Sequence, residues 1–155
     1  MTSPITIRPV TAADKAAWTP LWDGYLTFYE TVLSPEMSEL TWQRLLDPEY
    51  NSYGLVAELD GEVVGITHYS FQTSTWAEHG YCYLEDLFTK PELRGKGIGR
   101  ALINAVKAIA IERGCARVYW NTDESNATAR RLYDTFTTVS PKRQYRVRLD
   151  NPTHE

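Results

Sequence analysis

The sequence predicts a single α/β domain in which a mixed, mostly antiparallel and twisted sheet is flanked by helices. Three observations predict it. Runs of β-branched, aromatic and aliphatic residues alternate along the chain with amphipathic helical patterns. A glycine-rich turn joins one of these runs to a long helical segment. A chain of 155 residues, 43% of them hydrophobic, is also large enough for one packed core. We expect the domain to span residues 1–150 and residues 151–155 to form a short tail.

The first third of the chain predicts a strand followed by two helices. Residues 5–10 alternate apolar and polar side chains, as a strand does. Thr11, with Asp14 three residues later, forms a near capping box at the start of a helix. The aromatic and aliphatic residues of that helix recur at three- and four-residue spacings. Ser34 followed by Pro35 is a cap-then-proline signal that starts a second helix.

Three strands fill the middle of the chain. Asp60-Gly61 separates the first two and is the strongest short signal for a hairpin. We expect residues 72–80 to turn the chain into the third strand, which Pro91 ends because proline cannot donate to a sheet. The expected strands are residues 53–59, 62–71 and 81–89.

The last part begins with a long helix over about residues 98–113, with Gly114 as its C-terminal glycine. A strand, a short helix and a closing strand are expected after it. These elements are residues 117–121, 127 to about 136, and 145–149. The predicted element order is therefore β-αα-β-β-β-α-β-α-β.

Charge and composition bound the partners and the compartment. A net charge of −4 argues against nucleic-acid binding and favours a cationic substrate or partner. Cys82 and Cys115 make neither a disulfide framework nor a metal site, and we expect both to be reduced core residues. The N-terminus lacks the apolar core of a signal peptide, and no apolar run approaches the about 18 residues that a membrane helix needs. We expect a cytoplasmic protein without a membrane partner.

The strand, glycine turn and helix start around residue 95 predict an anion site. The N–H groups of a first helical turn lack intrahelical partners, and the helix dipole favours negative charge there. Three glycines let a ligand approach the backbone, and three cations surround them. We therefore expect this segment to bind a phosphate-bearing cofactor. Its residues are Arg94, Gly95, Lys96, Gly97, Ile98, Gly99 and Arg100.

Two familiar phosphate motifs do not fit these residues. A P-loop needs a glycine where Lys90 stands, and Ser or Thr where Gly97 stands. A dinucleotide fingerprint needs its third glycine at the position of Arg100. Both motifs are excluded.

The remaining pattern, Arg94-Gly-Lys-Gly-Ile-Gly99 at a strand-to-helix junction, resembles the acetyl-CoA pyrophosphate loop of the GNAT superfamily of N-acetyltransferases. The resemblance extends over most of the chain in element order. Leu84-Glu-Asp-Leu-Phe88, with Asn126 and Tyr133 downstream, is similar to the diamine (spermidine/spermine-type) acetyltransferase pattern. It implies transfer of an acetyl group from acetyl-CoA, in a ternary complex, to a primary amine. A small amine, a polyamine, an amino acid and a lysine side chain of a peptide all remain open as acceptors.

The resemblance also assigns the contacts of the donor. The pantetheine arm is expected to pair, like an extra strand, with the backbone of Leu87, Phe88 and Thr89. The strand is expected to bulge and to splay from its neighbour at residues 119–122, which leaves a cleft for the acetyl group. Asn126 is expected to contact the pantetheine or hold its loop, although a plain helix N-cap would look the same in sequence.

Two side chains are candidates for acid and base catalysis. Glu85 lies in the middle of its strand and is the candidate general base, directly or through a water; pairing with a structural cation is the alternative. The resemblance makes Tyr133 the general acid for the departing thiolate, and simple helix packing is the alternative. Asp86 alternates to the other face and is expected to be structural or an edge charge. Cys82 has no evident activating base, so direct transfer is favoured over a cysteine nucleophile. The chemistry needs no metal.

The acceptor contacts are expected from the first two helices and the loop before the central strand, and we assign Trp22, Tyr25 and Glu85 to substrate binding. Aromatic and acidic groups suit a cationic amine, although core or dimer contacts explain the helical aromatics equally well. His68 is expected to be an ordinary strand residue. The family commonly has a glycine and an aromatic residue a few positions after the tyrosine, whereas residues 136–139 are Phe-Thr-Thr-Val, so the shape of the last strand is not implied. The candidate acceptor-contacting residues of the first two helices and of the loop before the central strand are Trp18, Trp22, Tyr25, Tyr29, Trp76, Glu78 and His79.

Two further expectations follow from the resemblance. Relatives often dimerise, so we expect a homodimer. A catalytically idle acyl-CoA-binding sensor is the alternative function, and the presence of Glu85, Asn126 and Tyr133 favours the enzyme, because a sensor needs only the loop.

Overall fold

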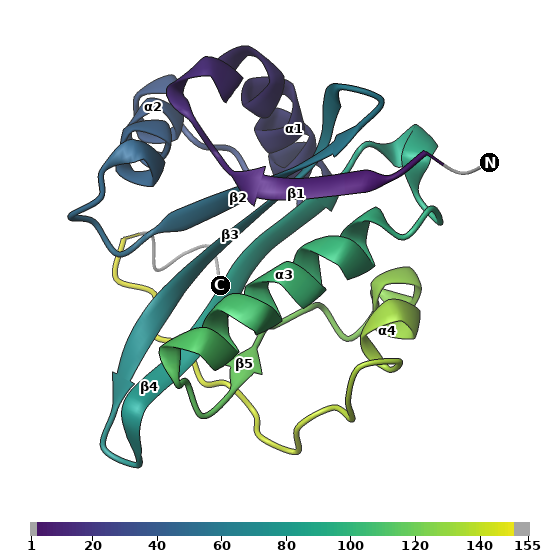
Figure 1. Ribbon diagram of the computed structural model, residues 1–155. Helices are drawn as coiled ribbons and strands as arrows, with labels where there is room; N and C mark the ends of the chain where they lie inside the picture. Colours follow the sequence, from purple (N-terminus) through teal and green to yellow (C-terminus); the bar gives the residue numbers. More distant parts are fainter. Residues whose placement is uncertain (1–2, 151–155) are drawn as a thin grey trace. The chain divides into compact units, whose positions relative to one another are not determined.

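The computed structural model describes residues 3–150, and the expected tail over residues 151–155 lies outside them (Figure 1). The chain divides into two compact units, Met1–Asn121 and Thr122–Glu155. The first unit contains the sheet and three of the α-helices, and the second contains one short helix.

The first unit is built on a five-stranded sheet in which the strands follow chain order, β1-β2-β3-β4-β5. The first three strand pairs are antiparallel, and β5 runs parallel to β4. This confirms the predicted mixed, mostly antiparallel sheet. The strands are β1 (Ile5–Pro9), β2 (Tyr53–Leu59), β3 (Glu62–Ser74), β4 (Ala77–Thr89) and β5 (Val118–Tyr119).

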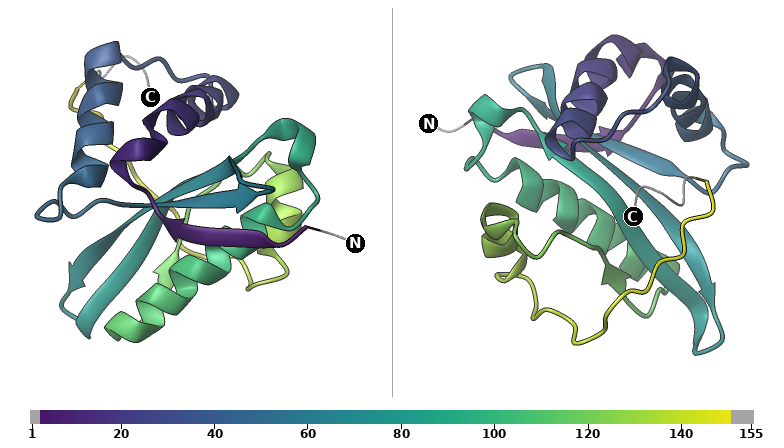
Figure 2. Two further views of the ribbon diagram at one scale, coloured as in Figure 1. Left: turned by 45° about the horizontal axis from the view of Figure 1, so that its top comes forward. Right: turned by 180° about the vertical axis from the view of Figure 1, so that it is seen from behind.

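Helices cover both faces of this sheet. Two helices, α1 (Lys15–Phe28) and α2 (Pro35–Leu46), lie on one face, and α3 (Ile98–Arg113) lies on the other (Figures 1 and 2). Short 3₁₀ turns, Ala12–Asp14 and Pro91–Leu93, precede α1 and follow β4. The predicted α/β architecture is confirmed.

The helices begin and end at residues that the sequence marks. The capping box of Thr11 and Asp14 is present, and the backbone N–H of Thr11 donates to Oδ2 of Asp14 at 2.7 Å. Oγ of Ser34 accepts from the backbone N–H of Met37 at 3.1 Å at the start of α2. Gly114 ends α3 in the left-handed region with φ +82°, where glycine carries no Cβ penalty.

Each face of the sheet has its own apolar layer. The α1/α2 layer brings indole rings against the sheet, and the α3 layer is aliphatic. Gly24 of α1 and Gly65 of β3 permit close packing: a Cβ at Gly24 would lie 2.8 Å from Cε2 of Phe88, and one at Gly65 would lie 2.9 Å from Cγ2 of Ile98. The buried residues of the first layer are Trp18, Leu21, Trp22, Trp42, Leu45, Val56, Val63, Ile66 and Phe88, and those of α3 are Ile98, Leu102, Ile103, Val106 and Ala110.

Both hairpins of the sheet turn tightly. Asp60 and Gly61 have φ of +54° and +78°, as a two-residue turn with both central residues at positive φ requires. The second hairpin turns within the expected segment, residues 72–80, but the turn is shorter than predicted, because β3 runs to Ser74 and β4 begins at Ala77. Gly80 is a bulge glycine: its φ is +71°, and a Cβ there would lie 2.0 Å from the carbonyl oxygen of Gln72.

The second unit contains α4 (Ala127–Tyr133) and an extended segment after it. The predicted closing strand over residues 145–149 is wrong, because these residues pair with no strand among residues 3–150. The pattern that predicted it leaves Tyr145, Val147 and Leu149 exposed at 93%, 85% and 90%. Alternation alone does not make a strand, and residues 145–149 are assigned to none.

Candidate active site

A β-bulge in β4 sets the position of Glu85. His68 pairs with Asp86 and Tyr69 pairs with Leu84, so Glu85 is the extra residue between two paired ones. Its side chain is exposed, yet partial desolvation and the negative charge of Asp86 raise the pKa of its carboxyl. A carboxylate with a raised pKa is a stronger base, which suits proton abstraction near neutral pH.

Next to the bulge, a buried hydrogen-bonded group fixes Asp86. The indole N–H of Trp18 donates to Nε2 of His68 at 3.0 Å. Since an indole nitrogen is only a donor, Nε2 is the accepting nitrogen, and Nδ1 carries the proton that faces Oδ2 of Asp86 at 2.9 Å. His68 is thus neutral and Asp86 is the acceptor. His68 is a strand residue, as predicted, but both of its ring nitrogens make buried hydrogen bonds that the prediction did not include. The sequence signal for these buried hydrogen bonds was a polar side chain at an inward-facing position of a buried strand.

Of the two aromatic residues assigned to substrate binding, Tyr25 lies against Asp86, whereas Trp22 belongs to the hydrophobic core. Burial, with the nearby charge of Asp86 and a hydrogen bond to it, raises the pKa of Tyr25. Trp22 is 5% exposed, and its indole N–H donates to Oγ of Ser38 at 3.0 Å. The rings of Trp22 and Tyr25 stack with centroids 5.4 Å apart.

The glycine turn before α3 has open space above it. Gly95 and Gly97 have φ of +83° and +85°, and a Cβ on either would meet no atom within 4 Å. The need for glycine therefore comes from backbone conformation and not from packing within the protein. Gly97 is the N-cap of α3, whose first-turn N–H groups lack intrahelical partners. The guanidinium of Arg94 lies over the Phe88 ring, 5.5 Å from its centroid.

One edge of β4 is open along the segment expected to hold the pantetheine. β5 pairs with β4 only at Cys82 and Tyr83. Leu87, Phe88 and Thr89 pair with β3, and within the part of the chain that the structure describes no strand pairs with their other edge. The sheet thus has an unpaired strand edge between the bulge and the glycine turn, as the expected splaying requires.

The remaining predicted site residues, Asn126 and Tyr133, belong to the second compact unit. Oδ1 of Asn126 accepts from the backbone N–H of Ala129 at 3.3 Å, which makes Asn126 the N-cap of α4. Tyr133 is the last residue of that helix. The predicted site residues are therefore divided between the two units.

The thiol of Cys82 is poorly suited to nucleophilic catalysis. Cys82 is fully buried, and burial raises the pKa of its thiol to about 11, which disfavours the thiolate. Cys82 and Cys115 are both free thiols.

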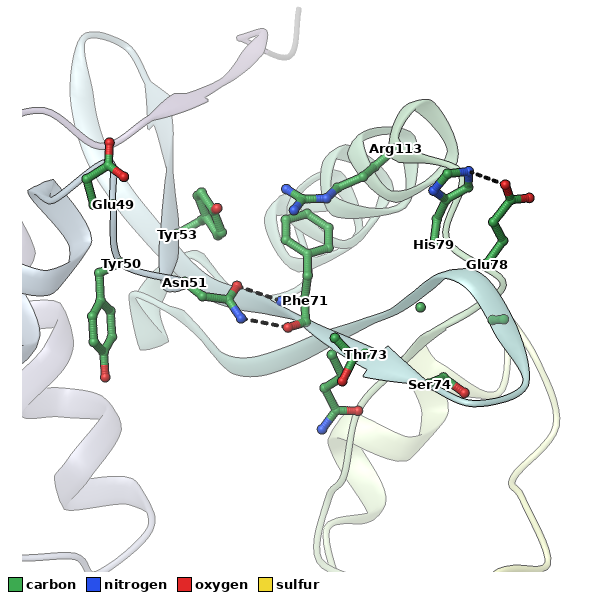
Figure 3. Close-up of a pocket in the computed structure, with 13 residues that line it drawn as sticks. Glu49, Tyr50, Asn51, Tyr53, Phe71, Thr73, Ser74, Glu78, His79 and Arg113 are labelled. Carbon is green, nitrogen blue, oxygen red and sulfur yellow. Dashed lines mark hydrogen bonds and ion pairs between the residues drawn. The ribbon is translucent and has the colours of Figure 1, made fainter.

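A separate cavity of about 520 Å³ lies beside the β3–β4 hairpin, and sequence reasoning did not predict it (Figure 3). Asn51 fixes its floor, because its side chain donates to the carbonyl of Phe71 at 2.6 Å and accepts from the N–H of Phe71 at 2.9 Å. The guanidinium of Arg113 covers the Phe71 ring, 3.7 Å from its centroid. None of the predicted catalytic or cofactor residues line this cavity.

Within residues 3–150, no group of three or more His, Cys, Asp or Glu side chains could hold a metal ion. None of the helices in this range combines the length and the apolar character needed to cross a membrane.

Comparison with known proteins identifies the family. Residues 18–136 match the model of the acetyltransferase (GNAT) family. The chain belongs to this family, as the glycine turn predicted, and it is an N-acetyltransferase.

Three similar proteins illustrate the relationship. A D-amino-acid N-acetyltransferase, HPA3, of Saccharomyces cerevisiae is 35% identical over 83% of this chain and 81% of its own length. A thialysine N-epsilon-acetyltransferase of Bos taurus is 41% identical over 46% of this chain and 41% of its own length. The solved structure of AAC(6')-Iy with a bisubstrate analogue, CoA-S-monomethyl-acetylneamine, has a TM-score of 0.80, with 19% identity over 95% of this chain and 100% of that chain.

Proposed function

We propose that the protein transfers an acetyl group from acetyl-CoA to a primary amine by direct transfer in a ternary complex. The single observation that carries this proposal is the bulge in β4. It leaves Glu85 exposed with a raised pKa, at one end of an open strand edge that leads to the glycine turn. One continuous segment of the chain therefore carries a candidate base, a strand edge for the donor and a glycine turn for the phosphates, which are the features that this chemistry needs.

The donor would lie along β4 and the start of α3. The first-turn N–H groups of α3 and the N–H groups of residues 95–97 would donate hydrogen bonds to the pyrophosphate oxygens, with Arg94 and Lys96 beside them. The open edge at residues 87–89 would pair with the amide groups of the pantetheine, as an added strand does. The bound bisubstrate analogue of the structural neighbour supports a coenzyme A donor by analogy of fold.

The chemical step would use Glu85 and Tyr133. Glu85 would take a proton from the acceptor ammonium, directly or through a water, because only the neutral amine has a lone pair for attack. The neutral amine would add to the thioester carbonyl to form the C–N bond, and backbone N–H groups along the open edge would stabilise the tetrahedral oxyanion. The C–S bond would break as this intermediate collapses, and the second proton lost by the nitrogen would replace, through solvent, the proton that Tyr133 gives up. Tyr133 would give its phenolic proton to the departing thiolate, and Asn126 would contact the pantetheine or hold the loop before α4. No metal takes part in this scheme.

The acceptor would be a cationic small molecule or peptide amine. The relatives named for D-amino acids and for thialysine support an amino group carried by an amino acid. Glu85 and Tyr25 would contact it, since Tyr25 lies within electrostatic range of both acidic residues of the bulge. Trp22 would not contact the acceptor itself but would hold the ring of Tyr25 in place by stacking on it.

The test is a turnover assay of acetyl-CoA with a panel of primary amines, run on the wild type and on Tyr133→Phe. We expect the wild type to acetylate at least one amine and Tyr133→Phe to retain acetyl-CoA affinity while kcat falls. If no amine consumes acetyl-CoA although the cofactor binds, the protein is a sensor of acyl-CoA and the enzymatic proposal fails.

We also propose a cytoplasmic homodimer. The exposed, alternating side chains of Tyr145, Val147 and Leu149 support a dimer, because a second copy could cover them. The two free thiols support a reducing compartment. The net charge of −4 favours an acceptor of positive charge over nucleic acid.

A further inference from the structure

A row of tyrosines leads from the bulge toward the far end of β4. Tyr81 and Tyr83 lie opposite Gln72 and Ser70, and Asp86 lies opposite His68. Residues that face each other across an antiparallel pair project to the same side, so Tyr81, Tyr83 and Asp86 share the sheet face on which α1 packs. This row therefore continues the acidic end of the candidate active site along the same surface.

The row is fixed by contacts on the neighbouring strands. Tyr83 stacks on Tyr119 of β5 with ring centroids 5.0 Å apart and an interplanar angle of 29°. The hydroxyl of Tyr119 donates to Oε1 of Gln72 on β3. The rings thus form a pre-organised wall rather than a set of free surface side chains.

Arg117 lies on this wall. Its guanidinium carbon is 3.9 Å from the centroid of Tyr81 and 5.3 Å from that of Tyr119. Stacking occupies the flat faces of a guanidinium and leaves its N–H donors around the edge, in the fork that matches a carboxylate. Within the described residues no carboxylate forms an ion pair with Arg117, and its side chain is exposed.

We propose that Arg117 binds the carboxylate of the acceptor, and hence that the acceptor is an amino acid whose reactive amine stands at the far end of its side chain. This inference rests on the proposed acetyl transfer at Glu85. The separation between Arg117 and Glu85 determines how long the acceptor must be. From Tyr81, on which Arg117 stacks, to Glu85 the strand rises roughly 13 Å, and the long side chains of Arg117 and Glu85 shorten this gap. An α-amine, one carbon from its own carboxylate, cannot reach both groups. A terminal amine on an extended side chain can.

Comparing two acceptors measures the contribution of the carboxylate alone. L-lysine and cadaverine have the same five-carbon diamine chain, and only lysine carries a carboxylate. We expect the wild type to acetylate lysine on its terminal amine, as mass spectrometry of the product would show. In Arg117→Gln the ratio of kcat/KM for lysine to that for cadaverine should fall about tenfold or more, through a higher KM for lysine. Arg117→Lys, which keeps the charge but not the fork, should lie between.

The matched control is Arg113→Gln. Arg113 also covers an aromatic ring, that of Phe71, but it belongs to α3 and to the other face of the sheet. Its replacement should leave the lysine-to-cadaverine ratio unchanged. Acetyl-CoA affinity and the thermal unfolding midpoint show that each variant is folded.

Several results would overturn the inference. They are acetylation of the α-amine, an Arg117→Gln ratio equal to that of the wild type, and a wild type that prefers cadaverine. In each of these cases acetyl transfer itself still stands. If instead no amine is acetylated, the proposed function fails, and calorimetric titration of the coenzyme A complex with lysine tests Arg117 directly: wild-type binding that Arg117→Gln weakens about tenfold upholds the carboxylate contact, and equal binding overturns it.

Discussion

The indole N–H of Trp18 points at Nε2 of His68 across 3.0 Å, and this contact decides which ring nitrogen of His68 accepts a hydrogen bond next to the bulge in β4. It makes Nε2 the acceptor and assigns the proton on Nδ1 to the bond with Asp86. Asp86 accepts this bond beside Glu85, and the charge of Asp86 helps to raise the pKa of the Glu85 carboxyl. A core tryptophan on α1 is therefore connected to the basicity of the candidate base on β4.

Removing the Trp18 donor should destabilise the fold more than removing a similar donor nearby. Trp18→Phe leaves the buried Nε2 of His68 without its partner, whereas Trp22→Phe frees the partly buried hydroxyl of Ser38, which water can reach. Both replacements lose similar core volume. We expect urea unfolding to show about 1 kcal/mol more loss of the free energy of unfolding for Trp18→Phe. Equal losses would mean that the contact with His68 carries no particular weight.

Glu85→Gln should lower kcat by about 10²–10⁴-fold with acetyl-CoA affinity retained, because an amide cannot accept the amine proton. Steady-state kinetics and cofactor titration measure the two effects separately. The control is Glu92→Gln, which removes an exposed carboxylate from the 3₁₀ turn before the glycines and should leave kcat near the wild-type value.

The pH dependence of the wild type gives a second readout of Glu85. A general base acts only when ionised, so kcat/KM should fall as the pH drops through the raised pKa of this carboxyl, with a midpoint above the ordinary glutamate value of 4.5. Glu85→Gln should lose this acidic limb. An unaltered pH profile in the variant would assign the limb to another group.

Gly97→Glu should abolish acetyl-CoA binding and leave the fold intact, because it places a carboxylate where the phosphate charge is expected. Gly61→Glu is a matched control: Gly61 also has a positive φ, of +78°, and open space around it, but it lies in the β2–β3 hairpin. Both variants should lose a similar amount of thermal stability from backbone strain. Unchanged cofactor affinity in Gly97→Glu would refute the assignment of the turn.

Acid should destabilise the protein through Asp14. Two hydrogen bonds of 2.8 Å from Arg8, together with the charge of Arg8, lower the pKa of Asp14 to about 2. A carboxyl with a lowered pKa contributes stability above its unfolded value of 3.8, and this stability is lost as the pH falls from 3.8 toward 2. Because Arg8 is partly exposed, we expect Asp14→Asn to cost about 1–2 kcal/mol at pH 7 and less near pH 2. Chemical denaturation at both pH values measures the difference, and an equal cost at both would contradict the assignment.

The exposed segment of the second unit should govern the oligomeric state. If a second copy covers it, the triple variant Tyr145→Ser, Val147→Ser, Leu149→Ser will be monomeric where the wild type is dimeric. Size-exclusion chromatography with light scattering distinguishes the two. Replacing the intervening Arg146 and Arg148 by Lys is the control and should preserve the dimer. A monomeric wild type would end the proposal.

Much of the fold could be predicted because its signals are local. Asp60-Gly61, Ser34-Pro35 and Gly114 each require a particular backbone conformation wherever they occur, and each lies where it was expected. The glycine turn was predicted in the same way, by its motif, whereas the role of Glu85 stays a prediction that rests on its position in a strand.

The features that could not be predicted depend on a neighbour. Gly80 resembles a turn glycine until the carbonyl of Gln72 is placed against it. His68 becomes a buried acceptor only when α1 brings Trp18 over β3. Residues 145–149 have the alternation of a strand, but alternation does not supply the strand beside it. The cavity beside the hairpin likewise arises from segments far apart in the sequence.

The packing of Gly24 against Phe88 restricts how this enzyme can be engineered. A glycine inside a helix is an attractive target for stabilisation, since alanine there is worth up to about 1 kcal/mol. At Gly24 the added methyl would press on the ring of Phe88, which belongs to the strand that carries Glu85. A thermostabilised library should therefore vary these two positions together, with a smaller residue at 88 wherever 24 is enlarged, or leave both as they are.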